Sequence, residues 1–229
     1  MILKLIYGKT DITGVSYTRP HRGGEDEFST SDSITFSIAF QAIVHIENKP
    51  FLLVITEAPD SYQQGSSYGY KAFYFFKENE KGFSIVDSIV SDEQEPLGNV
   101  SNYQIVDIGK NKEALVSTFQ NSHGYFTQVE SLYYITLGAL THLVSITDEY
   151  DNSDWNTPET EDDECNAEKS SGSFEIIRDN KDWYDIKVNE TEYGFTKGCQ
   201  ESYVKKETES VYSYNGQEYV EQKESNREK

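Results

Sequence analysis

The chain has 229 residues, with 40 acidic and 20 basic side chains, a formal net charge of −20, and 14% aromatic residues. This length suffices for one substantial domain or two small ones with an ordinary core. The negative charge repels phosphate backbones, which argues against nucleic acid as a partner. It also repels anionic membrane surfaces, and no apolar run approaches the roughly 18 residues of a membrane span, so we expect no membrane insertion.

Residues 1–33 precede the first long strand pattern. Within them VSYTRPHRGGEDEFSTSDS (15–33) is polar and loop-like, so we expect an N-terminal edge segment followed by a loop. The start, MILKLIYGK, is too short for the core of a signal peptide and lacks a small-residue cleavage site. This start leaves two possibilities. Because the chain has a single pair of cysteines, which fits an oxidising compartment, we expect a periplasmic or otherwise exported protein whose leader is absent from this chain, with a cytoplasmic protein as the alternative.

Three segments, 34–95, 96–150 and 173–229, repeat one pattern. Each opens with a run that alternates apolar and polar residues: ITFSIAFQAIVHI, NYQIVDIG or SFEIIRD. Such alternation indicates half-buried strands. Each run leads to an Asn-Lys pair and a second strand, then to a polar, Gly-rich stretch, an aromatic strand, a tight turn and a last strand.

The Asn-Lys pairs Asn48-Lys49, Asn111-Lys112 and Asn180-Lys181 have a local role. Asn tolerates a left-handed backbone at a strand-to-strand turn, and Lys keeps the tip of the turn in water. We therefore predict an all-β fold of three four-stranded antiparallel meanders in one compact domain overall. An acidic loop at 151–172 separates the second meander from the third.

The middle unit, YQIVDIGKNKEALVSTFQNSHGYFTQVESLYYI, resembles the FG-GAP/VCBS-like repeats of bacterial secreted proteins, which are of the β-propeller type. Those repeats have a hydrophobic-x-Asp-hydrophobic-Gly strand before Lys-x-x-hydrophobic-Val. The residues that match here are Val106, Asp107, Ile108, Gly109 and Leu115-Val116. The resemblance implies propeller-blade-like units. The family's calcium loop, Asp-x-Asp-x-Asp-Gly, is absent from every unit, and three units are fewer than the about four blades of a closed propeller, so an open or two-sheet arrangement is the alternative.

The acidic stretch DEYDNSDWNTPETEDDEC (148–165) is the most unusual part of the chain. Its oxygens could hold calcium, but their spacing matches no EF-hand loop, so we expect no cofactor and a solvated or partner-facing loop, with calcium as the alternative. Asp151, Asp154 and Trp155 are candidate partner contacts; the indole either packs inward or anchors an interface. Cys165 and Cys199 predict one disulfide formed in an oxidising compartment, with two free thiols as the alternative.

Two further loops, SYQQGSSYGY (61–70) and NSHGYFTQ (121–128), are rich in Tyr, Ser, Gly, Gln and Asn. That mixture is typical of binding loops, although such loops are also common in β proteins generally. Because both loops follow the second strand of their repeat, a meander would display them on one face. The candidate contacts are Tyr62, Tyr68, Tyr70, His123, Tyr125 and Phe126.

The chain has no His-Glu-x-x-His and no phosphate-binding Gly loop. Gly-x-Ser-x-Gly occurs once, at Gly65–Gly69, within the polar loop SYQQGSSYGY and not between a strand and a helix, which is where that motif acts in hydrolases. We therefore favour a non-enzymatic, protein-binding role, in the form of a bacterial immunity or inhibitor protein. Its acidic surface and Tyr-rich loops would neutralise a basic secreted enzyme or toxin. A carbohydrate- or cell-surface-binding module is the first alternative. A hydrolase on a propeller-like scaffold, with His123 as general base, is the second.

Overall fold

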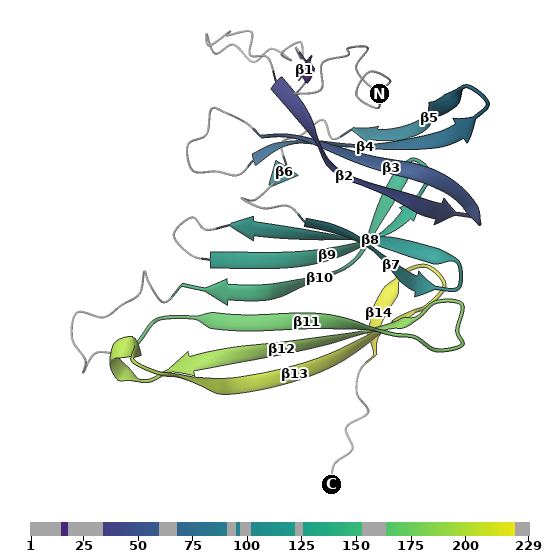
Figure 1. The fold of residues 1–229 in the computed structure, drawn as a ribbon. Coiled ribbons are helices and arrows are strands. Elements are labelled where there is room, and N and C mark those ends of the chain that lie inside the picture. The colour runs from purple at the N-terminus through teal and green to yellow at the C-terminus, as the bar shows by residue number, and fades with distance from the viewer. Residues whose placement is uncertain are drawn as a thin grey trace, which may run out of the picture. The chain divides into compact units, whose positions relative to one another are not determined.

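The structure, a computed structural model, describes residues 15–17, 34–59, 68–90, 95–96, 102–121, 126–152 and 164–222. Its contacts divide the chain into two compact units, 1–44 with 49–97 and 45–48 with 98–229, where the sequence predicts one domain. Each unit contains one open, largely antiparallel sheet (Figure 1). The predicted all-β class and the four-stranded meanders are confirmed.

The first unit is a six-stranded sheet of order β1-β2-β3-β4-β5, in which β6 pairs with β4. Its strands are β1 (Val15–Tyr17), β2 (Ile34–Ile46), β3 (Lys49–Pro59), β4 (Tyr68–Asn79), β5 (Gly82–Val90) and β6 (Glu95–Pro96). The first predicted repeat is therefore β2–β5. Residues 53–56 of β3 and 75–76 of β4 are fully buried at consecutive positions, so these stretches are covered on both faces.

The second unit is an eight-stranded sheet in which every strand neighbours the next one in the chain. Its strands are β7 (Asn102–Gly109), β8 (Lys112–Asn121), β9 (Phe126–Thr136), β10 (Ala139–Asp151), β11 (Lys169–Ile177), β12 (Asp185–Phe195), β13 (Ser202–Tyr214) and β14 (Tyr219–Gln222). The second and third predicted repeats are β7–β10 and β11–β14. They share one sheet and do not form separate blades.

The two halves of this sheet are joined over a short stretch. Strands β10 and β11 pair only at Glu149↔Ser171, Tyr150↔Ser170 and Asp151↔Lys169. Just beyond these pairs, a Cβ on Gly172 would lie 2.6 Å from the backbone oxygen of Thr147. Only glycine allows the two backbones to approach this closely, and from here the halves separate.

One apolar cluster then holds the separated halves together. Ile108, Val116 and Leu132 come from β7–β9, while Ile186 and Val188 come from β12. Burying each such side chain contributes about 1.5–3 kcal/mol relative to leaving it exposed. The core therefore lies between the second and third repeats.

The Asn-Lys prediction holds at two of the three sites. Asn48 and Asn111 have left-handed backbones, with φ of 62° and 57°, as expected for Asn in a tight turn. At the third site, Asn180 is not left-handed. There the carboxylate of Asp179 accepts the Lys181 N–H at 2.9 Å, and β12 begins only at Asp185.

Three other loop predictions are corrected. Tyr68 and Tyr70, assigned to a loop from sequence, lie in β4, where Tyr68 pairs with Pro96 and Tyr70 with Ala58. The polar, Gly-rich stretch of the third repeat, ETEYGFTKGCQES (190–202), was expected to be a long loop and is mostly the end of β12 and a short turn. The acidic segment starts after β10 and ends before β11, at 152–168, because β11 starts at Lys169.

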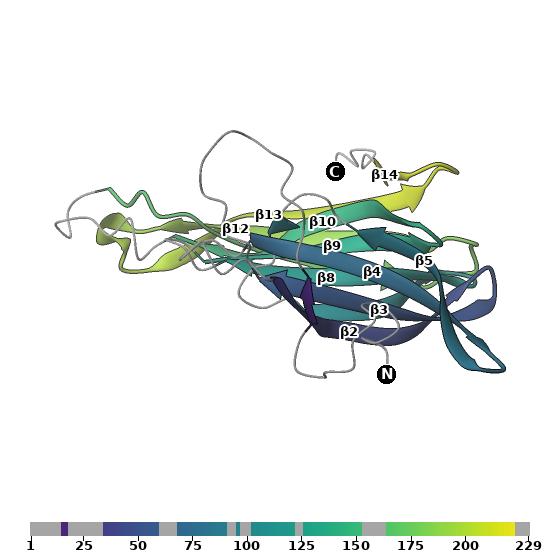
Figure 2. The ribbon, with the colours of Figure 1, turned by 90° about the horizontal axis from the view of Figure 1, so that it is seen from above.

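The second unit has two distinct ends, because its strands run broadly along one direction (Figures 1 and 2). One end carries β14, which begins at Tyr219, and Trp183 beside it; we call it the aromatic end. The opposite end carries the short 3-10 helix Lys197–Cys199 and the disulfide from Cys199 to Cys165; we call it the disulfide end.

Candidate functional site

The structure describes only part of the predicted contact set. Residues Tyr62, His123, Tyr125, Asp154 and Trp155 lie outside the described residues. Tyr68 and Tyr70 belong to the first unit and Phe126 and Asp151 to the second. The expectation that both Tyr-rich loops share one face therefore stays a prediction, while Phe126 and Asp151 can be placed.

Phe126 and Asp151 are direct cross-strand partners at the disulfide end, on β9 and β10. The same register continues from Asp151 to Lys169 on β11, from Lys169 to Tyr193 on β12, and from Tyr193 to Val204 on β13. Directly paired residues of antiparallel strands point to one face. We call this row Phe126–Asp151–Lys169–Tyr193–Val204 the cross-strand row.

The cross-strand row is accessible and combines an ion pair with apolar side chains. Val204 is 54% exposed, and the side chains of Lys169 and Asp151 are 33% and 25% exposed. The Lys169 ammonium donates to the Asp151 carboxylate at 3.0 Å. The Tyr193 hydroxyl lies 3.3 Å from the Ser171 hydroxyl, which anchors the phenol ring between Lys169 and Val204.

Lys169 is held in its charged form. Its hydrogen bond to Asp151 raises the pKa of the Lys169 ammonium, and the charges of Asp151 and Glu149 act in the same direction, against the opposing effect of burial. Because Glu149 adds a further negative charge beside the pair, the surroundings of Lys169 are acidic in sum.

Beside this row, hydrogen bonds join the two ends of the acidic segment 152–168 to each other. The Asn152 N–H donates to the Glu168 carbonyl at 3.1 Å, and the Glu168 N–H donates to the Asn152 side-chain oxygen at 2.6 Å. Cys165 and Cys199 form the predicted disulfide, with their Cα atoms 5.1 Å apart. The two ends of the acidic segment are thus attached to the sheet at three elements: β10, β11 and the β12–β13 turn.

The β12–β13 turn that receives the disulfide is itself closed. The Thr196 N–H donates to the Glu201 carbonyl at 2.9 Å, and the Glu201 N–H donates to the Thr196 hydroxyl at 3.1 Å. Gly198 and Cys199 are both left-handed, with φ of 71° and 55°. Since a left-handed backbone is uncommon for a residue other than glycine, the surrounding bonds hold Cys199 in this conformation.

A polar patch lies next to the row on β8–β10. The Gln128 amide donates to Asp148 and accepts from the Gln120 amide. Burial raises the pKa of the Glu130 carboxyl, the Asp148 charge raises it further, and a hydrogen bond with Thr118 opposes both. A glutamate whose pKa is raised in the folded protein binds more protons there than in the unfolded chain, so its contribution to stability is lost as pH rises.

Replacing Glu130 by Gln is therefore expected to stabilise the second unit at pH 7.5 and to have no such benefit near pH 4. The gain should stay below about 1 kcal/mol, since solvent screens this half-exposed pair. Urea unfolding at both pH values measures it. Glu218→Gln, in an exposed turn, controls for the loss of one negative charge; an equal gain at pH 4 would contradict the assignment.

At the aromatic end, the side chains pack against one another. The Trp183 ring stacks on Tyr214 with centroids 4.0 Å apart, and the Lys112 ammonium lies 5.0 Å from the indole centroid. Because Tyr214 covers one face, Lys112 covers the other. Neither face of this indole is available to stack on a sugar ring, so Trp183 gives no support to the carbohydrate-binding alternative.

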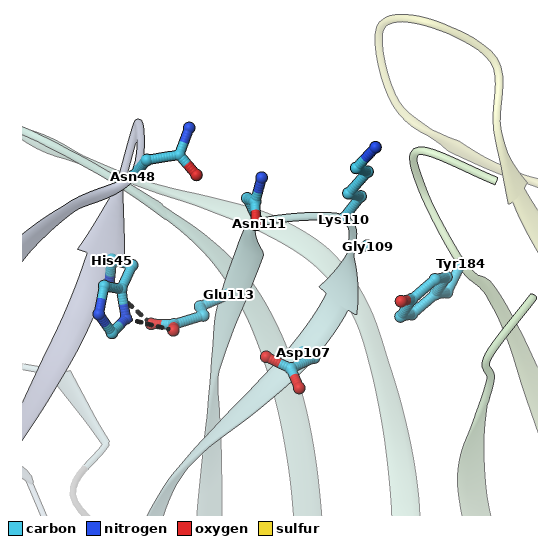
Figure 3. Close-up of a pocket in the computed structure, with 8 residues that line it drawn as sticks. All are labelled: His45, Asn48, Asp107, Gly109, Lys110, Asn111, Glu113 and Tyr184. Carbon is cyan, nitrogen blue, oxygen red and sulfur yellow. Dashed lines mark hydrogen bonds and ion pairs between the residues drawn. The ribbon is translucent and has the colours of Figure 1, made fainter. Parts of the chain in front are cut away.

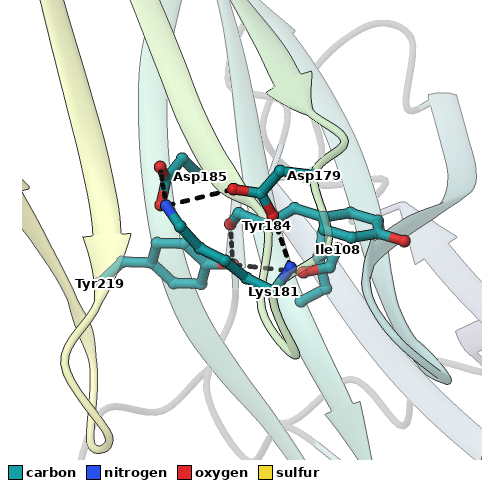
Figure 4. A network of polar contacts seen from close by, with 6 residues as sticks. All are labelled: Ile108, Asp179, Lys181, Tyr184, Asp185 and Tyr219. Atoms are coloured by element: carbon teal, nitrogen blue, oxygen red, sulfur yellow. Dashed lines mark hydrogen bonds and ion pairs between the residues drawn. The ribbon is translucent and has the colours of Figure 1, made fainter.

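Polar contacts complete the aromatic end (Figure 4). The Tyr219 hydroxyl donates to the Tyr184 carbonyl at 2.7 Å and lies 3.4 Å from the Ile108 carbonyl, which joins β14 to β7. Burial raises the pKa of the Tyr219 phenol. Lys181 forms ion pairs with both Asp179 and Asp185. Lys181 pairs with Oδ2 of Asp185, whereas Oδ1 of the same carboxylate is buried without a hydrogen-bond partner among the described residues.

An open pocket of about 490 Å³ also lies in the second unit, which includes residues 45–48 (Figure 3). Its lining residues are His45, Asn48, Asp107, Gly109, Lys110, Asn111, Glu113 and Tyr184. The His45 N–H donates to Glu113 at 2.8 Å, and the imidazole Nδ1 lies 2.9 Å from the same carboxylate. Among the described residues that line the pocket, none is Ser, Thr or Cys, and Tyr184 carries the one hydroxyl group.

Comparison with known protein families, curated proteins and solved structures found no match. The resemblance of the middle unit to FG-GAP/VCBS-like repeats therefore stays a prediction. Among the described residues, no group of three or more His, Cys, Asp or Glu side chains is arranged to hold a metal ion. The same residues include no helix that is long and apolar enough to cross a membrane.

The disulfide end is the strongest candidate site. Three of its residues, Lys169, Tyr193 and Val204, are not among the contacts predicted from sequence. The signal for Tyr193 and Val204 was the alternation in 185–195 and 202–214, which the Gly-rich composition of 190–202 obscured, whereas Lys169 is the first residue of β11. Their alignment with Phe126 and Asp151 depends on pairing between strands that no local pattern specifies.

Proposed function

We propose that this protein is a non-enzymatic binding protein of an exported compartment that neutralises a basic secreted enzyme or toxin. It would be an immunity or inhibitor protein, and the disulfide end would meet the partner. One observation carries the proposal: residues 148–164 hold nine carboxylates and no basic residue, and both ends of this stretch are fixed to the sheet beside the cross-strand row.

Charge and the disulfide both support this proposal. A concentrated negative charge accelerates encounter with a cationic surface, up to about 10⁸–10⁹ M⁻¹s⁻¹ from a neutral level of about 10⁵–10⁶ M⁻¹s⁻¹. Attachment at Asn152, Glu168 and Cys165 limits the conformations that the segment would lose on binding. Disulfides form and persist mainly in exported proteins, which agrees with a secreted partner.

The test begins with capture from the secreted and envelope fraction at low and at high salt. We expect one basic protein to be retained at low salt and weakened at high salt, and its activity to be inhibited by stoichiometric amounts of this chain. Retention of a cell-wall or capsule glycan without any protein partner would overturn the proposal in favour of the carbohydrate-binding module.

Association kinetics with the captured protein then test the acidic segment. Neutralising Glu159, Glu161, Asp162 and Asp163 to the corresponding amides is expected to lower the association rate about tenfold and to flatten its salt dependence. The matched control neutralises four exposed carboxylates elsewhere in the second unit: Glu175, Asp182, Glu190 and Glu218. Equal effects of both sets would show that only total charge matters.

A further inference from the structure

The cross-strand row has the composition of an interface centre. Aromatic residues are enriched at such centres, and a few of them carry most of the binding energy. Here Tyr193 lies between Lys169 and Val204 in register, and Phe126 lies beyond Asp151. The row is therefore an apolar and aromatic surface interrupted by one ion pair.

That ion pair occupies the place where a cationic partner would bind. Asp151 and Glu149 both act on the Lys169 ammonium, and the Lys169–Asp151 contact is direct. In the free protein Lys169 neutralises part of the acidic charge at the row. A partner's cation that reached Asp151 would have to compete with this lysine.

Arginine suits this position better than lysine. Its planar guanidinium stacks on aromatic rings and binds carboxylates through two parallel hydrogen bonds, whereas an ammonium is a strongly hydrated point charge. Tyr193 supplies the ring, and Asp151 supplies the carboxylate two strands away.

We propose that the cross-strand row is the docking surface for the basic partner, and that an arginine of the partner takes the place of Lys169 beside Asp151. This inference rests on the proposed function, because it specifies where and how the basic partner binds. The partner's chemistry is that of a protein surface with a protruding arginine next to apolar side chains.

The experiment uses a nine-arginine peptide that carries a photo-reactive group, with a nine-lysine peptide for comparison, at about physiological ionic strength. Affinity is measured by calorimetry on the full chain, and the cross-linked residues are identified by mass spectrometry. We expect the arginine peptide to bind more tightly than the lysine peptide and to cross-link to β11, β12 and β13 near the row.

Four substitutions test individual members of the row. Tyr193→Ala and Asp151→Asn are each expected to weaken binding of the arginine peptide about tenfold. Lys169→Gln is expected to strengthen it about threefold, because the competing cation is gone. Val204→Ser removes an exposed apolar side chain from the row. It provides a second test of the apolar part of the row in case Tyr193→Ala perturbs the fold.

The tyrosine and lysine substitutions each have a matched control. Tyr203→Ala removes an exposed aromatic residue from the neighbouring position of β13, where the side chain points to the opposite sheet face. Lys187→Gln removes a different ion-paired lysine, bonded to Glu209 at 2.7 Å. These controls should change affinity less than the corresponding variants in the row.

The outcomes separate the two proposals. In one outcome the arginine peptide binds in a salt-dependent way, its cross-links lie away from β11–β13, and the row variants bind it as their controls do. This result would overturn the docking surface and leave the proposed function standing. Absence of any salt-dependent binding to the arginine peptide would overturn the docking surface as well as the steering part of the proposed function.

Discussion

Replacing both Cys165 and Cys199 by serine is expected to lower the free energy of unfolding of the second unit by about 4 kcal/mol. The bond spans 34 residues, and closing a loop of this length removes conformational entropy from the unfolded chain by about that amount. The disulfide also fixes the returning end of the acidic segment. Its loss should therefore weaken partner binding in addition to stability.

Urea unfolding followed by tryptophan fluorescence measures this effect, because Trp155 and Trp183 both belong to the second unit. A reducing agent should bring the native chain down to the stability of the double variant and leave the variant itself unchanged. If the reduced native chain kept its unfolding midpoint, the bond would contribute nothing to the stability of this unit.

Replacing Trp183 by Ala is expected to cost about 3 kcal/mol, at the lower end of the range for truncating a large aromatic side chain, since this indole is half-buried. Its ring contacts Tyr134, Tyr214 and Tyr219. Its backbone bridges to Gly109 of β7, so the substitution would loosen the closure between the two halves of the sheet.

Far-UV circular dichroism during urea unfolding measures this loss without relying on the removed fluorophore. Trp183→Phe should recover part of it, because a smaller ring retains some of the stacking on Tyr214. Lys112→Met should cost about 0.5–1 kcal/mol, the value of an exposed cation–π contact. A loss below 1 kcal/mol for Trp183→Ala would mean that the aromatic end does not hold the halves together.

The two ends of the second unit divide structural and candidate binding roles. At the aromatic end, the rings and the Tyr219 hydroxyl are engaged with one another and with backbone carbonyls. At the disulfide end, Val204 of the cross-strand row is 54% exposed. Exposed apolar side chains on a sheet that is stabilised elsewhere are consistent with an interaction surface.

Most of the strands could be predicted from sequence. The alternation in 34–46 gave β2 with the same bounds, and 102–109 gave β7. These elements depend on local periodicity, which any strand with one covered face must show. The left-handed turns at Asn48 and Asn111 were predictable for the same reason, because turn chemistry involves only neighbouring residues.

The third sequence repeat shows where predictions from local patterns fail. Asn180-Lys181 resembles the other two pairs, but Asp179 and Asp185 bind the Lys181 ammonium, and Trp183 pairs with Gly109 from a distant strand. A Cβ on Gly109 would lie 2.3 Å from the Asp182 carbonyl oxygen. This long-range contact fixes the connection between β11 and β12 and overrides the local preference for a tight turn.

The sequence by itself determined the strand class, the number of meanders, two of the three Asn turns and the cysteine pair, because each follows from periodicity, local turn chemistry or composition. Only the tertiary structure decided that β10 pairs with β11, which fuses two repeats into one sheet. That pairing aligns Phe126, Asp151, Lys169, Tyr193 and Val204 in one row. The row depends on the register between β10 and β11, and register across a long connection is set by the packing of the whole sheet.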